Sequence, residues 1–294
     1  MIAASVVIPA FNAERMLGDC LRALDGQSLP ASEFEVIVVD DGSTDATGEV
    51  ARSFGARVIR QPNRGAGAAR NAGTRAARGE WVAFTDADCI PARSWLRSLV
   101  QAAQTPSGDQ VIGVAGKTVG FESRTAAARF CDMVGSLDAG NYLSHPIFPF
   151  APSSNLMYRR ALLAQAGGFD ERYVSYEACD LHCRITRDHR GPFVYEPRAL
   201  VFHRHRQTWS EYWRQQYSYG VGYGQFMLHH RDQCNWTLRH ELRTWGEIGR
   251  LSLSAWRPTH SDDLLYRRGL FVKKFAQHLG FTRARLDPKE RSRW

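Results

Sequence analysis

The chain has 294 residues, of which 44% are hydrophobic and 23% are charged, and this is the composition of a globular protein large enough to bury a core. It excludes a disordered chain, a collagen-like repeat and a small disulfide scaffold. No stretch reaches the roughly 20 apolar residues of a membrane-spanning helix, and the first ten residues lack the basic segment of a signal peptide. We therefore expect a cytoplasmic protein.

The excess positive charge is concentrated toward the C-terminus. The formal net charge is +8, and residues 204–294 hold 17 basic against 8 acidic residues, whereas residues 1–203 are close to neutral. This split indicates two functional regions, of which the basic one faces an anionic partner such as phosphate, nucleic acid or an acidic membrane surface. Six scattered cysteines without a Cys-x-x-Cys pair favour a reducing compartment.

The first hundred residues alternate short apolar runs with helical patterns, which is typical of βαβ units and a mainly parallel sheet. The pattern predicts strands at residues 5–9, 35–40, 56–60 and 81–85. A helix between the first two strands would bury Leu17, Cys20, Leu21 and Leu24, which recur at helical spacing. A second helix begins at Asp45 as its N-cap, and a third spans residues 65–77.

The rest of the chain is less regular and then becomes helical. We predict helices at residues 95–103, 160–166 and 177–188, and strands at 111–114, 155–158, 193–196 and 199–203. Beyond this point the sequence is helical, aromatic and basic. The sequence therefore predicts a domain over residues 1–205, with two parts at 1–110 and 111–205, followed by a C-terminal region over 206–294.

Acidic residues follow two of the predicted strands, where ligands of parallel sheets bind. Asp86 and Asp88 come directly after the fourth strand, and paired carboxylates suit Mg²⁺ or Mn²⁺. Asp40 and Asp41 end the second strand and are placed to accept hydrogen bonds from a base or ribose. A solvated turn is the alternative interpretation of the first pair, and a capped tight turn leaves the second pair unexplained.

A glycine-rich helix start at residues 64–73 offers free amides and two arginines, Arg64 and Arg70, that could clamp a diphosphate. It does not match a dinucleotide fingerprint, because Arg70 occupies the sixth place of Gly-x-Gly-x-x-Gly and the loop follows the third strand. The alternative is that the small residues let this helix pack close to the sheet.

In chain order these stretches resemble the inverting family 2 glycosyltransferases of the GT-A fold. The resembling segments are residues 5–12, 39–45, 63–73, 84–88, 154–160 and 168–172. The resemblance implies an α/β protein with a mainly parallel, Rossmann-like nucleotide-binding sheet, flanking helices and a mostly helical, basic C-terminal region.

The resemblance also implies roles for individual residues. It places Asp88, in the DXD motif, at the metal and makes Asp86 a contact of the ribose or sugar. The nucleotide-sugar-binding set that it implies is Pro9, Phe11, Asp40, Asp41, Arg64, Arg70, Asp86 and Asn155. GT-A enzymes often use a histidine at the end of the last sheet strand as a metal ligand, and His203 fits this place, with His205 as the alternate.

The chain departs from the family pattern at the expected catalytic base. Family members usually carry Gly-Glu-Asp-x-Asp-Leu-x-x-Arg, with the Asp after Glu as base, and alignment on Asp180 and Arg184 puts Ala178 in that place. Glu177 is the preferred base and Asp180 the alternative, although Asp180 stands four residues before Arg184 and could merely pair with it.

Two features of the C-terminal region admit two interpretations each. The aromatic residues of 209–226 suit a sugar face but are more typical of a core. Residues 264–279 form a basic amphipathic pattern with Arg267, Arg268, Lys273 and Lys274, which suits either an anionic membrane surface or a solvated helix over the core.

The expected activity is metal-dependent, inverting, hexosyltransferase-type transfer in glycan biosynthesis. The donor would be a nucleoside diphosphate sugar, preferably a UDP-sugar, the cofactor Mn²⁺ or Mg²⁺, and the acceptor a hydroxyl of a glycan, a lipid-linked sugar or a small molecule. No nucleic-acid partner is expected, and the absence of Gln-x-x-Arg-Trp favours non-processive transfer. The rivals are a catalytically degraded relative, suggested by Ala178, and a nucleotide-dependent oxidoreductase, against which the position of Arg70 argues.

Overall fold

A computed structural model describes residues 2–104, 111–145, 148–233, 237–255, 257 and 260–293. The chain divides into two compact units. The first comprises Met1–Phe121, Gly135–Glu171 and Glu177–Arg204, and the second comprises Glu122–Val134, Arg172–Tyr176 and His205–Trp294. The two short segments of the second unit lie inside the region that the sequence pattern placed before residue 206.

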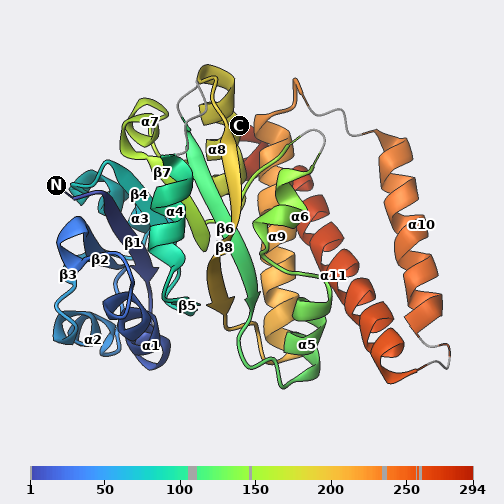
Figure 1. The fold of residues 1–294 in the computed structure, drawn as a ribbon. Helices are drawn as coiled ribbons and strands as arrows, with labels where there is room; N and C mark the ends of the chain where they lie inside the picture. The colour runs from blue at the N-terminus through green and yellow to red at the C-terminus, as the bar shows by residue number, and fades with distance from the viewer. Residues whose placement is uncertain are drawn as a thin grey trace. The chain divides into compact units, whose positions relative to one another are not determined.

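A single sheet forms the centre of the first unit (Figure 1). In the described part of the chain it has eight strands in the order β3-β2-β1-β4-β7-β6-β8-β5. The strands are β1 (Ala4–Ala10), β2 (Phe34–Asp40), β3 (Arg57–Arg60), β4 (Trp81–Thr85), β5 (Cys89–Pro91), β6 (Gly113–Gly120), β7 (Asn155–Arg159) and β8 (Phe193–His203).

The first four strands are parallel, as predicted, and this aligns their carboxyl ends. Strand β1 pairs with β2 on one side and β4 on the other, so that Ala10 lies opposite Asp40. Strand β7 runs antiparallel to both β4 and β6. The acidic turns after β2 and β4 therefore belong to the same edge of the sheet.

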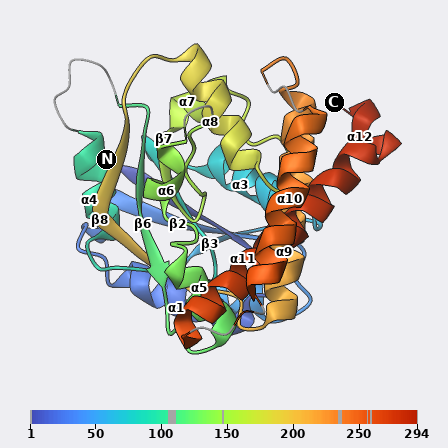
Figure 2. The ribbon, with the colours of Figure 1, turned by 90° about the vertical axis from the view of Figure 1, so that its right-hand side faces the viewer.

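Helices cover both faces of this sheet. Those of the first unit are α1 (Glu14–Asp25), α2 (Thr47–Ser53), α3 (Ala66–Ala76), α4 (Trp95–Ala103), α6 (Ala139–Leu143), α7 (Arg160–Gln165) and α8 (Glu177–Asp188), with a short 3₁₀ helix at Ala31–Glu33. Successive side chains of a strand point to opposite faces, so Val6 packs with residues of α1 and α4, whereas Val7 packs with residues of α3 and α8. Figure 2 shows α4 on one side of the sheet and α3 and α8 on the other.

The predicted face of α1 is confirmed, because Leu17, Cys20, Leu21 and Leu24 are all buried. The predicted N-cap of α2 is displaced by one residue. The N-cap position falls on Ala46, while the Asp45 carboxylate accepts a hydrogen bond from the Thr47 backbone N–H at 3.1 Å. Asp45 therefore still satisfies a helix-start amide, although it does so from the residue before the cap.

The two strands predicted at 193–196 and 199–203 are one continuous strand, β8, and this corrects the prediction. Strand β6 pairs with β8 in parallel, but the register shifts between Gly116 and Lys117, so that Glu196 and Leu200 occupy successive places in the ladder. Residues 197–199 form the bulge. Pro197 lies in this bulge, where its missing N–H removes no ladder hydrogen bond.

The second unit is helical in its described part. It contains α5 (Ala126–Met133), α9 (Trp209–His229), α10 (Leu238–Ala255), α11 (Ser261–Leu286) and α12 (Pro288–Arg293). Helices α9 and α11 approach closely at Gly220, which has no Cβ. A Cβ at this position would lie 1.9 Å from the Gln277 carbonyl oxygen. Tyr212 and Phe226 of α9 are buried, which favours the interpretation of these aromatic residues as core.

Candidate active site

The turn after β2 places two carboxylates side by side, and both accept hydrogen bonds from the chain itself. Asp41 accepts hydrogen bonds from the backbone N–H groups of Arg64 at 3.0 Å and Gly65 at 2.8 Å, and from Gln61 Nε2 at 2.7 Å. These amides belong to the start of α3, where the helix dipole favours an anion. Asp41 therefore fixes the entry to the glycine-rich helix.

Asp40 is buried and stabilises the same turn. Its Oδ1 accepts a hydrogen bond from the Ser43 N–H at 2.9 Å, and its Oδ2 lies 3.8 Å from Arg60 Nε. At the end of β1, by contrast, Phe11 is 50% exposed and Pro9 is half-buried. Of the nucleotide-sugar-binding residues that the resemblance implied, Phe11 thus offers an exposed aromatic ring, whereas Asp40 and Asp41 shape the turn after β2.

Arg70 connects two carboxylates that are far apart in the sequence. Its Nη1 donates to Glu177 Oε1 at 2.9 Å and its Nη2 donates to Asp86 Oδ1 at 2.8 Å. The guanidinium is buried, with its carbon 5.7 Å from the centre of the Phe169 ring. Burial alone would lower the pKa of Arg70, but the carboxylates of Asp86 and Glu177 raise it above its ordinary value.

This arrangement brings together three of the residues proposed from the sequence. The side chains of Asp86 and Glu177 are 28% and 14% exposed, whereas that of Arg70 is 5% exposed. Solvent and ligands therefore reach the carboxylates more readily than the arginine. Arg70 positions these two side chains, and a diphosphate would have to compete with both of them for its N–H groups.

Asp180, the alternative base, is fully buried in an ion pair. It accepts hydrogen bonds from Arg184, with Nε at 2.8 Å and Nη2 at 2.7 Å from its Oδ2. Arg184 also donates to the carbonyl oxygens of Ala166 and Gly168, the latter at 2.8 Å. The pair thus ties α8 to the loop after α7. Ala178, at the usual base position, lies in the hydrophobic cluster with Val7.

The loop that follows α7 is held by one amide side chain of α3. Asn71 accepts a hydrogen bond from the Phe169 N–H at 2.8 Å and donates to the Phe169 carbonyl at 2.8 Å. Gly168 has φ +75°, and a Cβ there would come within 2.5 Å of Asn71 Oδ1. Glycine is required here both by backbone conformation and by space. The loop in turn places Phe169 against Arg70.

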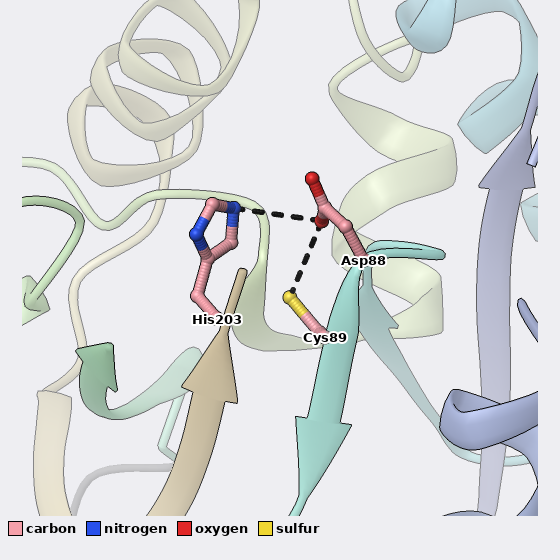
Figure 3. A group of neighbouring side chains, drawn as sticks. All are labelled: Asp88, Cys89 and His203. Atoms are coloured by element: carbon pink, nitrogen blue, oxygen red, sulfur yellow. Dashed lines mark hydrogen bonds and ion pairs between the residues drawn. The ribbon is translucent and has the colours of Figure 1, made fainter. Parts of the chain in front are cut away.

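The two antiparallel strands β5 and β8 bring the proposed metal ligands together (Figure 3). Asp88 precedes β5, and His203 ends β8 opposite Cys89. His203 Nε2 lies 3.5 Å from Asp88 Oδ1, and Cys89 Sγ lies 3.8 Å from the same oxygen. Carboxylate, imidazole and thiol donors within 4.8 Å of one another fit a divalent cation.

His205, the alternate ligand, has a different environment. It belongs to the second unit, where its Nε2 lies 3.3 Å from Asp132 Oδ1. In the first unit the histidine beside Asp88 is His203. Between the two, the geometry therefore favours His203 as the candidate ligand.

Two further residues from the resemblance are already engaged within the chain. Asn155 is 1% exposed, and its amide accepts a hydrogen bond from Trp95 Nε1 at 2.8 Å while donating to the carbonyls of Lys117 and Ala199, both at 2.9 Å. Arg64 remains half-exposed but forms an ion pair with Glu171 at 2.5 Å. Asn155 thus braces the sheet, and Arg64 is more accessible than Arg70.

Sequence reasoning missed Cys89, Asn71 and Glu171 as neighbours of the site. Cys89 directly follows Asp88, and Glu171 lies in the segment 168–172 that was noted for its family pattern. The sequence thus showed where these residues lie along the chain. It did not show which residues they contact, because each contact joins residues of different elements.

An α/β fold whose central mixed sheet carries carboxylates at the ends of its parallel strands is the architecture of the GT-A glycosyltransferases. The model of the family "Glycosyl transferase family 2" matches residues 5–167. The chain belongs to this family.

Relatives with sequence similarity are also glycosyltransferases by name. The pre-mycofactocin glycosyltransferase of Mycobacterium tuberculosis is 32% identical over 78% of this chain and 48% of its own length. The glycosyltransferase AglE of Haloferax volcanii is 30% identical over 92% of this chain and 87% of its own length. The chain thus spans about half the length of the mycobacterial relative.

Solved structures share the fold. The mannosyltransferase PcManGT from Pyrobaculum calidifontis, in complex with GDP-Man and Mn²⁺, has a TM-score of 0.68 at 19% identity, over 96% of this chain and 86% of its own. TarS 1-349 of S. aureus in complex with UDP-GlcNAc has a TM-score of 0.57 at 19% identity, over 96% and 92%. The predicted GT-A fold is thereby confirmed.

Proposed function

We propose that the chain transfers a hexose from a nucleoside diphosphate donor to an acceptor hydroxyl, with inversion at the anomeric carbon and with help from a divalent cation. The observation that carries this proposal is that Arg70 holds both Glu177 and Asp86, and that Asp88, two residues after Asp86, lies beside His203. A candidate base and a candidate metal site then meet at the carboxyl ends of the strands, where ligands of such sheets bind.

Glu177 is the group we assign to the acceptor. Its carboxylate would take the proton of the acceptor hydroxyl as that oxygen attacks the anomeric carbon. Arg70 supports this role because its charged hydrogen bond to Glu177 fixes the orientation of that carboxylate. A single displacement then needs no covalent intermediate, which is why the outcome is inversion.

Asp88 and His203 are the residues we assign to Mn²⁺ or Mg²⁺, and Cys89 lies beside them. A cation bound there would offset the negative charge of the departing diphosphate. We assign donor binding to residues 1–110 and the acceptor side to 111–205. Within the donor part, Phe11 offers its exposed ring to the base and Arg64 its exposed cation to the diphosphate.

A UDP-sugar remains our preferred donor. The neighbouring structures were solved with GDP-Man, with UDP-GlcNAc and with UDP, so the nucleoside diphosphate is common to them while the base differs. We further propose non-processive transfer on the cytoplasmic side, where nucleotide sugars would be available to it. In the part of the chain that the structure describes, no helix is long and apolar enough to span a bilayer.

The second candidate is a relative that binds nucleotide sugars without transferring them. Ala178 favours it, because the usual base position carries no carboxylate and lies in the hydrophobic cluster. The two candidates share donor binding and differ only in turnover.

The test is a panel of radiolabelled UDP- and GDP-sugars, each incubated with the full chain with and without Mn²⁺. Hydrolysis or transfer that depends on both the cation and Glu177 supports the transferase. Donor binding by calorimetry without any turnover, with or without added acceptors, supports the binding protein. An absence of binding to every nucleoside diphosphate would overturn both.

A further inference from the structure

Cys89 stands where a third ligand of the metal site would be. It opens β5 directly across from His203 and is fully buried. Its side chain meets that of Asp88, although consecutive strand residues point to opposite faces, because Asp88 still belongs to the turn before the strand. Figure 3 shows the thiol and the imidazole both directed toward the Asp88 carboxylate.

The distances are those of atoms that share one ion. Metal bonds of about 2.0–2.2 Å for nitrogen and oxygen and about 2.3 Å for sulfur place tetrahedral neighbours about 3.4–3.6 Å apart. The observed separations from Asp88 Oδ1 are 3.5 Å to His203 Nε2 and 3.8 Å to Cys89 Sγ. A cation would thus need only small adjustments to contact all three.

We propose that Cys89 is a ligand of the divalent cation, together with Asp88 and His203, and that it shifts the preference of the site toward thiophilic ions. When the sulfur–metal bond forms, the thiol proton passes to the buffer. Thiolate and imidazole donors favour Zn²⁺ and Co²⁺ over Mg²⁺. This inference rests on the proposed metal site and adds a ligand to it.

Cys20 provides a matched control. It is also fully buried, but its Sγ lies 3.6 Å from the Asp86 carbonyl oxygen rather than beside the three donor atoms. Replacing either cysteine by serine makes a comparable change in a buried side chain. Only the Cys89 change removes a proposed ligand.

The experiment titrates the full chain with Co²⁺ and records the near-ultraviolet thiolate-to-cobalt charge-transfer absorption. We expect this band in the wild type and in Cys20→Ser, and its loss in Cys89→Ser and Cys89→Ala. Competition should show Zn²⁺ affinity reduced by about 10–100-fold in the Cys89 variants, the range typical even of groups outside the ligand shell. Thermal melting confirms that each variant is folded.

The outcomes separate this inference from the proposed function. Suppose that the wild-type chain binds Mn²⁺ through Asp88 and His203 but shows no thiolate-to-cobalt band with Co²⁺, or that Cys89→Ala keeps this band. In either case Cys89 is not a ligand, and the transferase proposal stands. Loss of the band in Cys20→Ser also overturns the inference. Failure of both Mn²⁺ and Co²⁺ to bind, with UDP present, overturns the metal site itself.

A second inference concerns the outward side of α10, and a different observation carries it. Two large apolar side chains of this helix are highly exposed, Leu242 by 64% and Leu253 by 70%, whereas Trp245 is 41% exposed and its ring packs edge-on against that of His278 of α11 at 4.8 Å. Their spacing puts them on one stripe of the helix. Gly246 and Gly249 lie on the same stripe, and a Cβ on either would meet no atom within 4 Å.

The charges of α10 are divided between its two sides. Glu247 pairs with Lys274 and Glu241 with His278 of α11, each at 2.8 Å, so both acidic residues of α10 are turned toward α11. The exposed charged residues of α10 are the arginines Arg239, Arg243 and Arg250, of which Arg243 lies 3.4 Å from Glu247. At helical spacing all three lie along the same side of the apolar stripe, which is thus bordered by positive charge on that side.

The basic cluster of α11 is used within the second unit instead. Arg267 pairs with Asp263 at 2.7 Å, Lys274 pairs with Glu247, and Arg268 Nε donates to the Ala255 carbonyl at 3.2 Å. Lys273 is half-buried, and burial lowers its pKa. Of the cations that the sequence offered for membrane contact, Lys274 and Arg268 thus link α11 to α10, and Arg267 pairs within α11.

We infer that the outward stripe of α10, and not the cluster of α11, binds the surface of an anionic bilayer. Exposed Leu side chains beside a row of arginines are complementary to acyl chains and acidic headgroups. Each basic residue near such a surface contributes about 1 kcal/mol, and salt weakens the attraction.

The test is co-sedimentation of the full chain with vesicles of neutral or acidic phospholipid. We expect binding to acidic vesicles that Leu242→Ser/Leu253→Ser and Arg239→Gln/Arg250→Gln each reduce several-fold, and that the control Arg267→Gln/Arg268→Gln retains. Equal sedimentation with both vesicle types, or loss only in the α11 control, overturns the inference. Thermal melting of each variant excludes unfolding as the cause.

Discussion

The carboxylates of Asp86 and Glu177 are held by the two ends of one buried guanidinium, that of Arg70. Asp86 follows β4 and Glu177 begins α8, so Arg70 joins the end of a parallel strand to the start of a helix far along the chain. Each carboxylate retains some exposure, and the cation between them keeps two like charges close at low cost.

Replacing Glu177 by Gln should remove the proposed base while leaving the donor site intact. We expect kcat to fall by about 10²–10⁴, the span for loss of a general base, with little change in donor affinity. Steady-state kinetics and calorimetry with donor measure the two effects. Normal turnover of Glu177→Gln would contradict the assignment.

The matched variant Asp180→Asn should instead lower stability. Its carboxylate is fully buried against Arg184, and removing one partner of a buried ion pair costs about 3–5 kcal/mol. Chemical denaturation measures this loss. A stable but inactive Asp180→Asn would transfer the role of base to Asp180.

Replacing Arg70 by Met should lower kcat, because Asp86 and Glu177 lose the hydrogen bonds that hold both carboxylates in place. Arg70→Lys should lower kcat as well, because an ammonium group cannot bond both carboxylates with the fixed fork of a guanidinium. Steady-state kinetics measures both variants, and an unchanged kcat in Arg70→Met would contradict a positioning role for Arg70.

Asp88→Ala should abolish cation-dependent donor binding without unfolding the chain, because Asp88 lies in a turn at the edge of the sheet. Calorimetric titration of Mn²⁺ with UDP checks this. The exposed residue Asp25 on α1 supplies the control Asp25→Ala, which should bind as the wild type does. Wild-type-like cation dependence in Asp88→Ala would remove this residue from the site.

Acid should destabilise the first unit through His182. Its Nδ1 lies 2.8 Å from the Tyr158 hydroxyl, and burial lowers its pKa from 6.5 to about 4. Between pH 6.5 and 4 the folded state thus binds fewer protons than the unfolded state. The contribution of His182 to the free energy of unfolding is therefore at its maximum above pH 6.5 and is lost as the pH falls from 6.5 to 4. The loss should approach about 3 kcal/mol.

Denaturation at several pH values, compared with His182→Gln, isolates this effect from that of other titrating groups. The variant should show a smaller decline across the same range. An equal decline in both proteins would show that His182 does not titrate as its burial indicates.

The parallel half of the sheet was predictable from the sequence because its strands are apolar on both faces and are separated by regular helices. Strand β5 was missed, since three residues ending in Pro91 give no periodic signal. Strand β8 was divided in two because Pro197 interrupts the pattern, and only pairing with β6 shows that the strand continues beyond the bulge.

The sequence predicted which residues belong to the candidate site but not how they contact one another. The order of the motifs identified Asp86, Asp88 and Glu177 as candidates. That Arg70 would pair with two of them, and that Cys89 would face His203, depends on how α8 and β8 approach the first strands. Such long-range pairing has no local signature in the sequence.

Asn155 has a consequence for how the sheet opens. Its amide bonds the carbonyls of Lys117 and Ala199 at the bulge, where the ladder between β6 and β8 changes register. If this brace were lost, the last residues of β8 could separate locally, carrying His203 away from Asp88 while β1 and β2 stayed paired. In Asn155→Ala, backbone amides of residues 200–203 should therefore exchange with deuterium well before those of the parallel strands, so that the order of His203, the proposed metal ligand, depends on one amide side chain of the separate strand β7.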